Sequence, residues 1–200
     1  MQAVIIDSGG ANLASLQFAF ERLGARTRVS ADPDEIAQAP RVILPGVGSA
    51  QDAMRRLRDS SVARILPSLT QPVLGICLGM QLLFRHSEEG STDCLGILPG
   101  TVHRLQAQVG RPVPHMGWNQ IVPQRQDPLL EGIDANDYVY FVHSYFVPGD
   151  PTSSLTLASA EYGTAVAAVV RQRNFWGTQF HPERSADTGA RILKNFLSLS

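Results

Sequence analysis

The stretch PVLGICLGMQLLF, residues 72–84, changes at one cysteine from a short apolar run of strand type into a helical pattern. Glycines stand on both sides of that cysteine, with Gly75 before and Gly79 after Cys77. Small residues at these positions allow a strand to turn sharply into a helix, the arrangement known as a nucleophile elbow. The stretch therefore predicts that Cys77 is presented at a sheet edge, beside a helix N-terminus that favours thiolate. The competing interpretation is a buried, inert cysteine in an ordinary turn.

The residues before this stretch alternate short β-branched runs with helical patterns. Strands are predicted at 3–7, 27–30, 41–46 and 72–76, and helices at 12–24 and 49–60. Asn12 is the predicted N-cap of the first helix, and Gly24 is predicted to close it. Because strands that alternate with helices are joined by crossovers, a parallel sheet covered by helices on both faces is expected. Ligands bind such sheets at the carboxyl ends of the strands.

After residue 88 the pattern changes to segments typical of antiparallel strands or hairpins. They are 101–105, 119–123, 137–148, 155–163, 166–174 and 175–183. A final amphipathic helix is predicted at 185–200, and 90–100 is predicted to be a loop. Without a repeat or a linker, 200 residues suit a single domain, 1–200. The predicted fold is α/β: a three-layer open sheet with mostly parallel central strands, flanking helices and an antiparallel extension.

Composition excludes several classes of function. Charged residues make up 18% of the chain, hydrophobic residues 44%, and the formal net charge is −1, so a nucleic-acid partner is not expected. No apolar run approaches the roughly 20 residues of a membrane span, and the N-terminal residues do not resemble a signal peptide. A cytoplasmic protein is expected. The two cysteines, Cys77 and Cys94, are then expected to be reduced, and Cys94 has no assignable role.

A histidine near the end of the chain is the candidate base for the cysteine. A thiol that attacks an amide needs an imidazole, and the imidazole needs an orienting acceptor. In the segment FWGTQFHPE, His181 ends a predicted strand and Glu183 follows two positions later, on the same side of an extended chain. The other histidines show no pair at metal-ligand spacing, so no metal site is expected.

Glycine turns supply the other candidate groups. The motif LPGVG, residues 44–48, follows a predicted strand, and its glycines let backbone amides approach a ligand closely. We expect Val47 and Gly48 to contribute one half of an oxyanion hole and the Leu78 N–H the other half. The alternative is an ordinary turn with Ser49 as N-cap. The segment 8–12 lacks the spacing of a nucleotide fingerprint and is predicted to be a turn and cap.

Together, GICLGMQ (75–81), LPGVG (44–48) and HPE (181–183) strongly resemble the triad-type glutamine amidotransferases, along nearly the whole chain. The additional stretches DSGGANL (7–13), PHMGWN (114–119) and YFVHSY (140–145) resemble the glutaminase subunits of imidazole glycerol phosphate synthase, from histidine biosynthesis.

This resemblance implies a residue-by-residue mechanism. Cys77 attacks the γ-carboxamide of glutamine, His181 protonates the leaving ammonia, and water then hydrolyses the thioester to glutamate. Glu183 orients His181. By the same resemblance, Gln81 and the stretch His143-Ser144-Tyr145 line the glutamine pocket. The resemblance implies no cofactor.

The resemblance also implies a partner. Such subunits form a heterodimer with a barrel-shaped cyclase, which receives ammonia through an internal passage and makes imidazole glycerol phosphate and aminoimidazole carboxamide ribotide. Met116, Trp118 and Asn119 are candidate interface residues in a loop-like setting, and Tyr140 and Arg184 are further candidates. Lysine is common at the position of Arg184 in this family, so a role that needs lysine is not carried over.

Three alternatives are left open. The Val47 N–H points either toward the site or away from it, and a loaded partner is a candidate driver of its realignment. The glutaminase subunit of another ammonia-using synthase would keep the chemistry and change the partner. The third alternative is an inactive scaffold, which would keep the fold only to regulate a partner and would lack the glutaminase chemistry.

Overall fold

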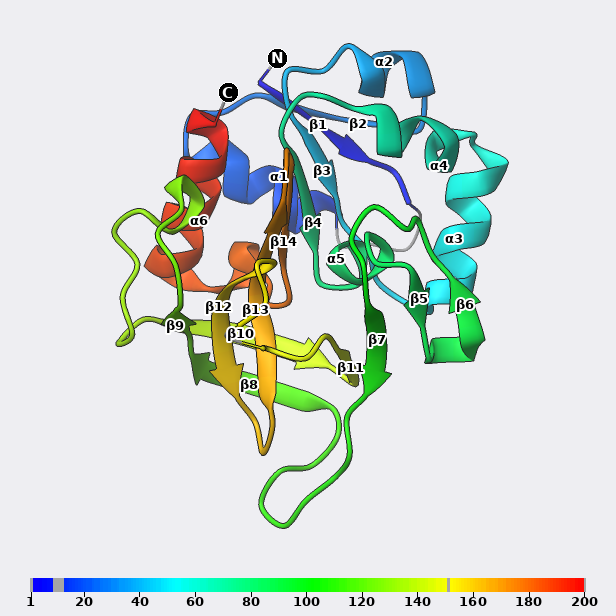
Figure 1. The fold of residues 1–200 in the computed structure, drawn as a ribbon. Helices are drawn as coiled ribbons and strands as arrows, with labels where there is room; N and C mark the ends of the chain where they lie inside the picture. The colour runs from blue at the N-terminus through cyan, green and yellow to red at the C-terminus, as the bar shows by residue number, and fades with distance from the viewer. Residues whose placement is uncertain (1, 9–12, 151, 200) are drawn as a thin grey trace.

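The computed structural model describes residues 2–8, 13–150 and 152–199. Within them, the largest sheet has the strand order β2-β1-β3-β4-β14-β13-β12-β9 (Figure 1). In that order the strands are Thr27–Ser30, Ala3–Ile6, Val42–Leu44, Val73–Ile76, Phe175–Thr178, Ala165–Gln172, Thr156–Glu161 and Val122–Pro123. The strands from β2 to β14 pair in parallel, and β13, β12 and β9 continue the sheet antiparallel. The predicted fold class is confirmed.

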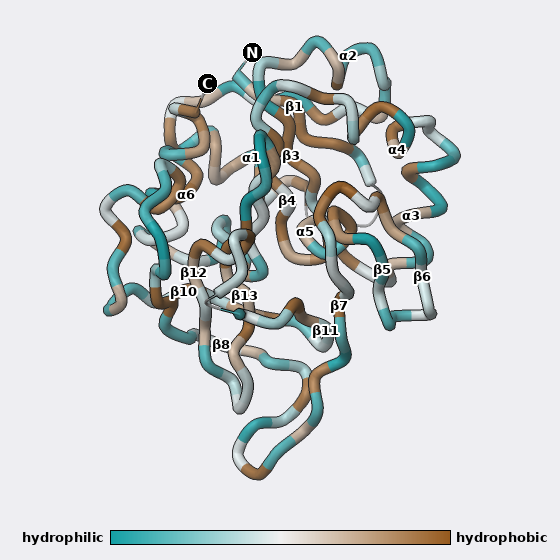
Figure 2. The backbone as a smooth tube through the Cα atoms, viewed as in Figure 1, coloured by the Kyte–Doolittle hydropathy of each residue, from teal (hydrophilic) through white to brown (hydrophobic). Residues whose placement is uncertain are grey.

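Helices cover both faces of this sheet because its parallel strands are apolar on both sides. In β1, Ala3 and Ile5 belong to the same buried cluster as residues of α1 (Leu13–Arg22) and α6 (Ala186–Ser198). Val4 and Ile6 point to the other face and join a second cluster. That cluster includes residues of α2 (Pro33–Ala37), α3 (Ala50–Asp59), α4 (Val62–Ile65) and α5 (Leu78–Leu82). Figure 2 shows the hydrophobic colours gathered on the central strands and α5.

Local capping chemistry sets the helix bounds. Ser49 is the N-cap of α3, and its Oγ accepts a hydrogen bond of 3.2 Å from the Asp52 N–H. Past the end of α1, Gly24 has φ of +74°, a conformation that suits glycine after a helix. The N-cap predicted at Asn12 and all but Ser8 of the turn predicted at 8–12 lie outside the described residues.

The second half of the chain adds two smaller sheets. β8 (His115–Gln120) and β10 (Tyr138–His143) form an antiparallel pair, and β11 (Tyr145–Phe146), β7 (Thr101–Arg104), β5 (His86–Ser87) and β6 (Thr92–Asp93) form the other sheet. Short 3-10 turns are η1 (Leu66–Ser68), η2 (Glu89–Ser91), η3 (Pro128–Leu130) and η4 (Pro182–Arg184). The predicted loop at 90–100 therefore contains part of η2 and the strand β6. The predicted strand at 137–148 is divided into β10 and β11.

One strand of the second half lies where the sequence pattern did not place it. β14 pairs antiparallel with β13, as expected of a hairpin, but it also pairs in parallel with β4, with Thr178 opposite Ile76. β3, β4 and β14 are consequently neighbours. Since parallel strands end at one edge, the segments that follow these three strands meet at the carboxyl edge of the sheet.

Among the helices of the described residues, none combines the length and the apolar character needed to cross a membrane.

Candidate active site

Cys77 occupies a strained turn between β4 and α5. Its backbone has φ of 54° and ψ of −112°, which a residue with a side chain rarely adopts and which surrounding contacts must enforce. The Cys77 N–H donates a hydrogen bond of 2.7 Å to the Thr178 carbonyl. A Cβ added to Gly79 would lie 1.8 Å from the Leu44 carbonyl oxygen, and one added to Gly75 would lie 2.7 Å from the Cα of Met80. This geometry is that of a nucleophile elbow, which requires both flanking glycines.

His181 lies beside this elbow, together with Glu183. The His181 Nδ1 is 2.8 Å from Glu183 Oε1, and both side chains are largely buried. Burial alone lowers the pKa of His181, but hydrogen bonds and charge interactions with Cys77 and Glu183 raise it to about 10. The imidazole is therefore protonated near neutral pH, and it lines the same cavity as the cysteine.

The reason given for the His181–Glu183 contact needs correction. Sequence spacing suggested an extended chain, but Glu183 lies in the 3-10 turn η4. Tyr140 of β10 holds this turn through its backbone: its carbonyl accepts from the His181 N–H at 3.0 Å, and its N–H donates to Ser185 Oγ at 2.9 Å. Ser185 Oγ in turn donates to the His181 carbonyl at 2.7 Å. A strand distant in sequence thus positions the histidine.

A cavity of about 430 Å³ opens beside the cysteine, within the size range of small-ligand sites. The predicted site residues among its lining are Val47, Gly48, Cys77, Leu78, Gln81, His143, Ser144, Tyr145, His181, Glu183 and Arg184. The fold therefore gathers the predicted triad, oxyanion and pocket residues from segments spread over most of the chain.

The LPGVG loop packs directly against the elbow. A Cβ on Gly46 would lie 2.8 Å from the Gly79 backbone nitrogen, so the two backbones approach closely only because both residues are glycine. The buried Ser8 Oγ donates to the Pro45 carbonyl at 3.1 Å and ties the loop to the end of β1. Gly48 has φ of +89°, which also favours glycine. The loop is thus held where its backbone lines the cavity beside Leu78.

Gln81 of α5 lines the cavity. Its Nε2 donates to the Tyr145 carbonyl at 2.8 Å and to Gln179 Oε1 at 3.0 Å. Both amide hydrogens are thereby committed to the protein, so Gln81 Oε1 is the group that remains for a ligand. An oxygen acceptor at this position suits a positively charged ligand group.

His143 lines the cavity, but both of its ring nitrogens have protein partners. Nδ1 lies 2.9 Å from the Tyr145 carbonyl, which can only accept, so Nδ1 carries the proton. Nε2 then accepts from His115 Nδ1 at 3.0 Å. His143 is thus a lining residue, as predicted, whose imidazole supports the Tyr145 segment.

This buried histidine pair predicts a loss of stability in acid. Burial lowers the pKa of His115 to about 4, and burial together with the charge of His115 lowers the pKa of His143 to about 3. As the pH falls below about 6.5, these two histidines become protonated in the unfolded chain but stay neutral in the folded chain. Each histidine should lower the free energy of unfolding by about 1.4 kcal/mol per pH unit over this range.

Urea unfolding at pH 7, 6 and 5 measures this slope. The stability from these histidines is present above pH 6.5 and is lost as the pH falls toward 4. His115→Leu should flatten the slope between pH 6.5 and 5 by about 1.4 kcal/mol per pH unit, whatever its effect on absolute stability. An unchanged slope in this variant would contradict the assignment.

The candidate interface residues divide between two faces of the antiparallel pair β8–β10. Met116 and Trp118, predicted in a loop, lie on β8 and are 62% and 53% exposed. The Trp118 ring packs edge-on against Tyr140, and the Arg184 guanidinium lies 5.2 Å from the centroid of the Tyr140 ring. The Asn119 side chain donates to the Glu161 carbonyl at 2.9 Å and lies near His115, on the opposite face from Trp118. We call Met116, Trp118 and Tyr140, together with Arg184 of η4, the β8–β10 face.

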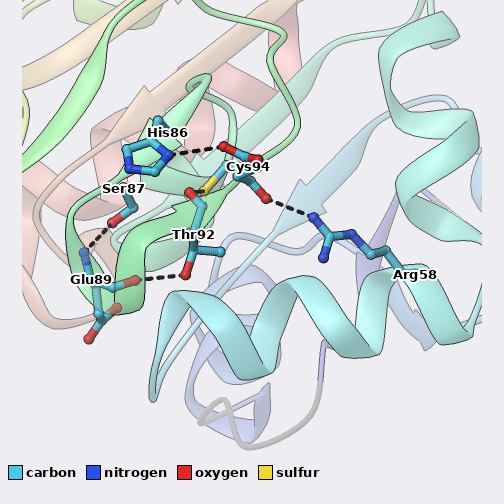
Figure 3. A network of polar contacts seen from close by, with 7 residues as sticks. Arg58, His86, Ser87, Glu89, Thr92 and Cys94 are labelled. Atoms are coloured by element: carbon cyan, nitrogen blue, oxygen red, sulfur yellow. Dashed lines mark hydrogen bonds and ion pairs between the residues drawn. The ribbon is translucent and has the colours of Figure 1, made fainter.

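Cys94 does not line the cavity and lies in a network of polar contacts with residues of the β5–β6 region (Figure 3). Its thiol lies 3.6 Å from the Thr92 carbonyl, and Arg58 of α3 donates to the carbonyl of neighbouring Asp93 at 2.8 Å. Burial is the main cause that raises the pKa of the Cys94 thiol to about 11. At pH 7 about one molecule in ten thousand then carries the thiolate at this position, so Cys94 is expected to be unreactive.

Two residues at the site were missed by the sequence analysis. Glu89 lines the cavity, and its carboxylate accepts from the Ala50 N–H at the start of α3 at 2.7 Å. No local pattern marks it, because it depends on the fold of η2. Gln179 is fully buried and its Nε2 lies 3.9 Å from Cys77 Sγ. Its spacing of two residues from His181 in a predicted strand was an available signal.

Among the described residues, no group of three or more His, Cys, Asp or Glu side chains is arranged so that it could hold a metal ion.

Solved structures support the fold. A protein of Thermoplasma acidophilum, described as a putative GMP synthase component, superposes with a TM-score of 0.74 at 21% identity, over 98% of this chain and 91% of that one. A structure described as a glutamine amidotransferase gives a TM-score of 0.74 at 19% identity, over 98% and 97% of the two chains.

Sequence relatives are much more similar. A protein of Xanthomonas campestris pv. campestris (strain 8004) is 53% identical over 196 residues, 98% of this chain and 96% of the relative. Proteins of Xylella fastidiosa and Idiomarina loihiensis are each 50% identical, over 99% and 100% of this chain and 98% and 99% of the relatives. All three carry the name imidazole glycerol phosphate synthase subunit HisH. Residues 4–199 also match the family model described as Glutamine amidotransferase class-I, and the chain therefore belongs to the class I glutamine amidotransferases.

Proposed function

We propose that this chain is the glutaminase subunit of an imidazole glycerol phosphate synthase. It hydrolyses glutamine to glutamate and ammonia and passes the ammonia to a cyclase subunit in histidine biosynthesis. The observation that carries the proposal is that Cys77, His181 and Glu183 line one cavity, with His181 bonded to Glu183, in a chain about half identical to HisH proteins over its full length. We propose further that residues 1–200 act as one domain in the cytoplasm.

The geometry supports acyl transfer through the cysteine. Cys77 Sγ attacks the side-chain carbonyl carbon of glutamine, and the carbonyl π electrons move to its oxygen. Backbone N–H groups of the LPGVG loop, at Val47 and Gly48, and of Leu78 stabilise the resulting oxyanion. His181, held by Glu183, gives its proton to the leaving nitrogen, so the C–N bond breaks and ammonia and a thioester form.

The second half of the reaction uses the same groups in reverse. His181, now neutral, takes a proton from a water molecule as that water attacks the thioester carbonyl. Collapse of the second tetrahedral intermediate breaks the C–S bond and releases glutamate. Cys77 and the protonated His181 are then restored, so the cycle consumes only glutamine and water.

The polar part of the cavity lining suits the amino-acid end of glutamine. Gln81 presents a carbonyl oxygen, and Glu89 adds a carboxylate that is anchored by its bond to the Ala50 N–H. These acceptors complement an α-ammonium group. Ser144 and Tyr145 also line the cavity, and His143 holds Tyr145 in place through its carbonyl. We propose that these groups select an L-amino acid whose side-chain amide reaches Cys77.

The β8–β10 face is the proposed docking surface for the cyclase. It presents two exposed large apolar side chains, Met116 and Trp118, beside Tyr140 and Arg184. Aromatic and arginine side chains commonly dominate the energy of protein interfaces. Because the backbone of Tyr140 also holds the His181 turn, a partner on this face would contact the element that positions the histidine. We propose a heterodimer with the barrel-shaped cyclase, without nucleic acid or membrane contacts.

Glutamate release from glutamine, measured with and without the cyclase and its nucleotide ligand, tests the proposal. We expect release to depend on Cys77 and to rise at least about tenfold when the loaded cyclase is added, because docking supports the site through the Tyr140 backbone. Trp118→Ala should weaken this activation and leave the rate of the isolated chain within about twofold. A rate of glutamate release that does not change when the loaded cyclase is added would assign the chain to another ammonia-using synthase. No glutamate release under any condition would indicate an inactive scaffold.

A further inference from the structure

Gln179 connects the cysteine to the cavity wall, although no role was expected for it. It follows β14, whose last residue, Thr178, accepts the Cys77 N–H. The Gln179 side chain is fully buried, with Nε2 3.9 Å from Cys77 Sγ and Oε1 3.0 Å from Gln81 Nε2. Its own backbone N–H donates to the Ala168 carbonyl at 2.9 Å, which fixes it in the sheet.

A chain of hydrogen bonds sets the orientation of this amide. The Tyr145 carbonyl can only accept, so the atom of Gln81 beside it must be the nitrogen. The second hydrogen of that nitrogen is donated to Gln179, so the atom of Gln179 that faces Gln81 must be its oxygen. The nitrogen of Gln179 is then turned toward the sulfur of Cys77. The Tyr145 carbonyl thus fixes the orientation of the Gln81 amide, and through it that of the Gln179 amide. As a result, an N–H donor faces the Cys77 sulfur.

We propose that Gln179 is a positioning residue that donates an amide N–H to the Cys77 thiolate and favours it over the thiol. This inference rests on the proposed role of Cys77 as nucleophile. A thiol at this position has an acceptor of its own, the Val142 carbonyl, 3.9 Å from the sulfur. Loss of the proton removes that bond, and the sulfur then keeps the Gln179 N–H as a donor in addition to the His181 imidazolium. Hydrogen bonds to a charged acceptor are roughly twice as strong as neutral ones, so this donor favours the charged form.

Gln179 and His181 divide two tasks at the same sulfur. His181 supplies a mobile proton, whereas the amide proton of Gln179 cannot be transferred and contributes only a directed dipole. Since the amide is buried and its orientation is locked through Gln81, it needs no reorganisation when the charge forms. A residue that acts in this way should change the pH profile of the cysteine, which a residue that only fills space would not do.

Two variants of similar size separate these roles. Gln179→Met removes the donor without adding a charge. Gln179→Glu keeps an oxygen that can accept from Gln81 but places a second oxygen where the donor stood. The measured quantity is the rate of Cys77 alkylation by iodoacetamide from pH 5 to 10, followed by mass spectrometry of the Cys77 peptide. Cys94 in the same digest is an internal control.

We expect both variants to shift the pH midpoint of Cys77 alkylation upward by about one unit or more and to slow alkylation at pH 7 about tenfold. A Gln179→Met profile that superposes on that of the unaltered chain would overturn the proposal. A shift in Gln179→Glu alone would also overturn it, because the effect would then come from the added charge. Far-UV circular dichroism and the unfolding midpoint establish that each variant is folded.

The test does not depend on the proposed function. Alkylation needs neither glutamine nor a partner, so an unaltered chain that is alkylated but releases no glutamate would refute the glutaminase and leave the role of Gln179 measurable. If neither variant folds, the side-chain amide resonances of Gln179 in the isotope-labelled, unaltered chain replace them. These should shift with the same pH midpoint as Cys77 alkylation and lose that shift in Cys77→Ser. Resonances that do not move would overturn the proposal.

Discussion

Cys77→Ala is expected to lower glutamate release from glutamine by at least about a thousandfold, because the thioester route has no other nucleophile at the elbow. Replacement of a nucleophile commonly costs this much or more, since the remaining groups act as a unit with it. The measurement is single-turnover and steady-state glutamate release with the loaded cyclase present, so that loss of docking is not mistaken for loss of chemistry. Trapping of the thioester by hydroxylamine should disappear in the variant.

Cys94→Ala is the matched control, because the chain holds only these two cysteines. Cys94 lies in the β5–β6 region and does not line the cavity. Its replacement should leave glutamate release within about twofold. Comparable activity in Cys77→Ala and Cys94→Ala would exclude covalent catalysis at Cys77.

Gly79→Ala should destabilise the fold by more than about 3 kcal/mol, because its added Cβ would lie 1.8 Å from the Leu44 carbonyl oxygen. The clash is with backbone, so no side-chain rotation relieves it. It lies between β3 and α5, and relief would require the elbow to separate from the LPGVG loop. For a chain of this size, thermal denaturation should show a fall of the midpoint by about 10 °C.

Gly24→Ala is the control for this substitution. Gly24 has φ of +74° but nothing within 4 Å of an added Cβ, so it reports the conformational cost alone. We expect a loss of about 1 kcal/mol in this variant. Equal losses at the two positions would show that contact of the elbow with β3 is not what requires glycine. Gly79→Ala protein that remains folded should also release glutamate more slowly, since the Leu78 N–H would be displaced.

The residues of the predicted triad were available from the sequence because their spacing carries local information. Two glycines around Cys77 mark a strained turn whatever surrounds it, and the strained backbone at Cys77 agrees with that prediction. Alternation of short apolar runs with helical patterns similarly marked the parallel strands β1 to β4. Each of these signals depends on neighbours within about ten residues of the chain.

The contacts that the sequence analysis did not predict depend on pairing between distant segments. Whether Asn119 faces out or in is fixed by the register of β8 against β10, where Trp118 stands opposite Tyr140. A shift of one residue would exchange the two faces of the strand. The same pairing brings His115 to His143, so that both ring nitrogens of this predicted pocket residue have protein partners.

The sequence by itself determined the α/β class, the elbow and the identity of the residues with reactive side chains. Only the tertiary structure decided that β14 lies parallel beside β4, which brings His181 to Cys77, and that Gln179 and Glu89 belong to the site. The physical reason is the range of the forces involved. Turn strain and side-chain periodicity act between near neighbours, whereas strand order and hydrogen-bond orientation follow from the packing of the whole core, which no single stretch encodes.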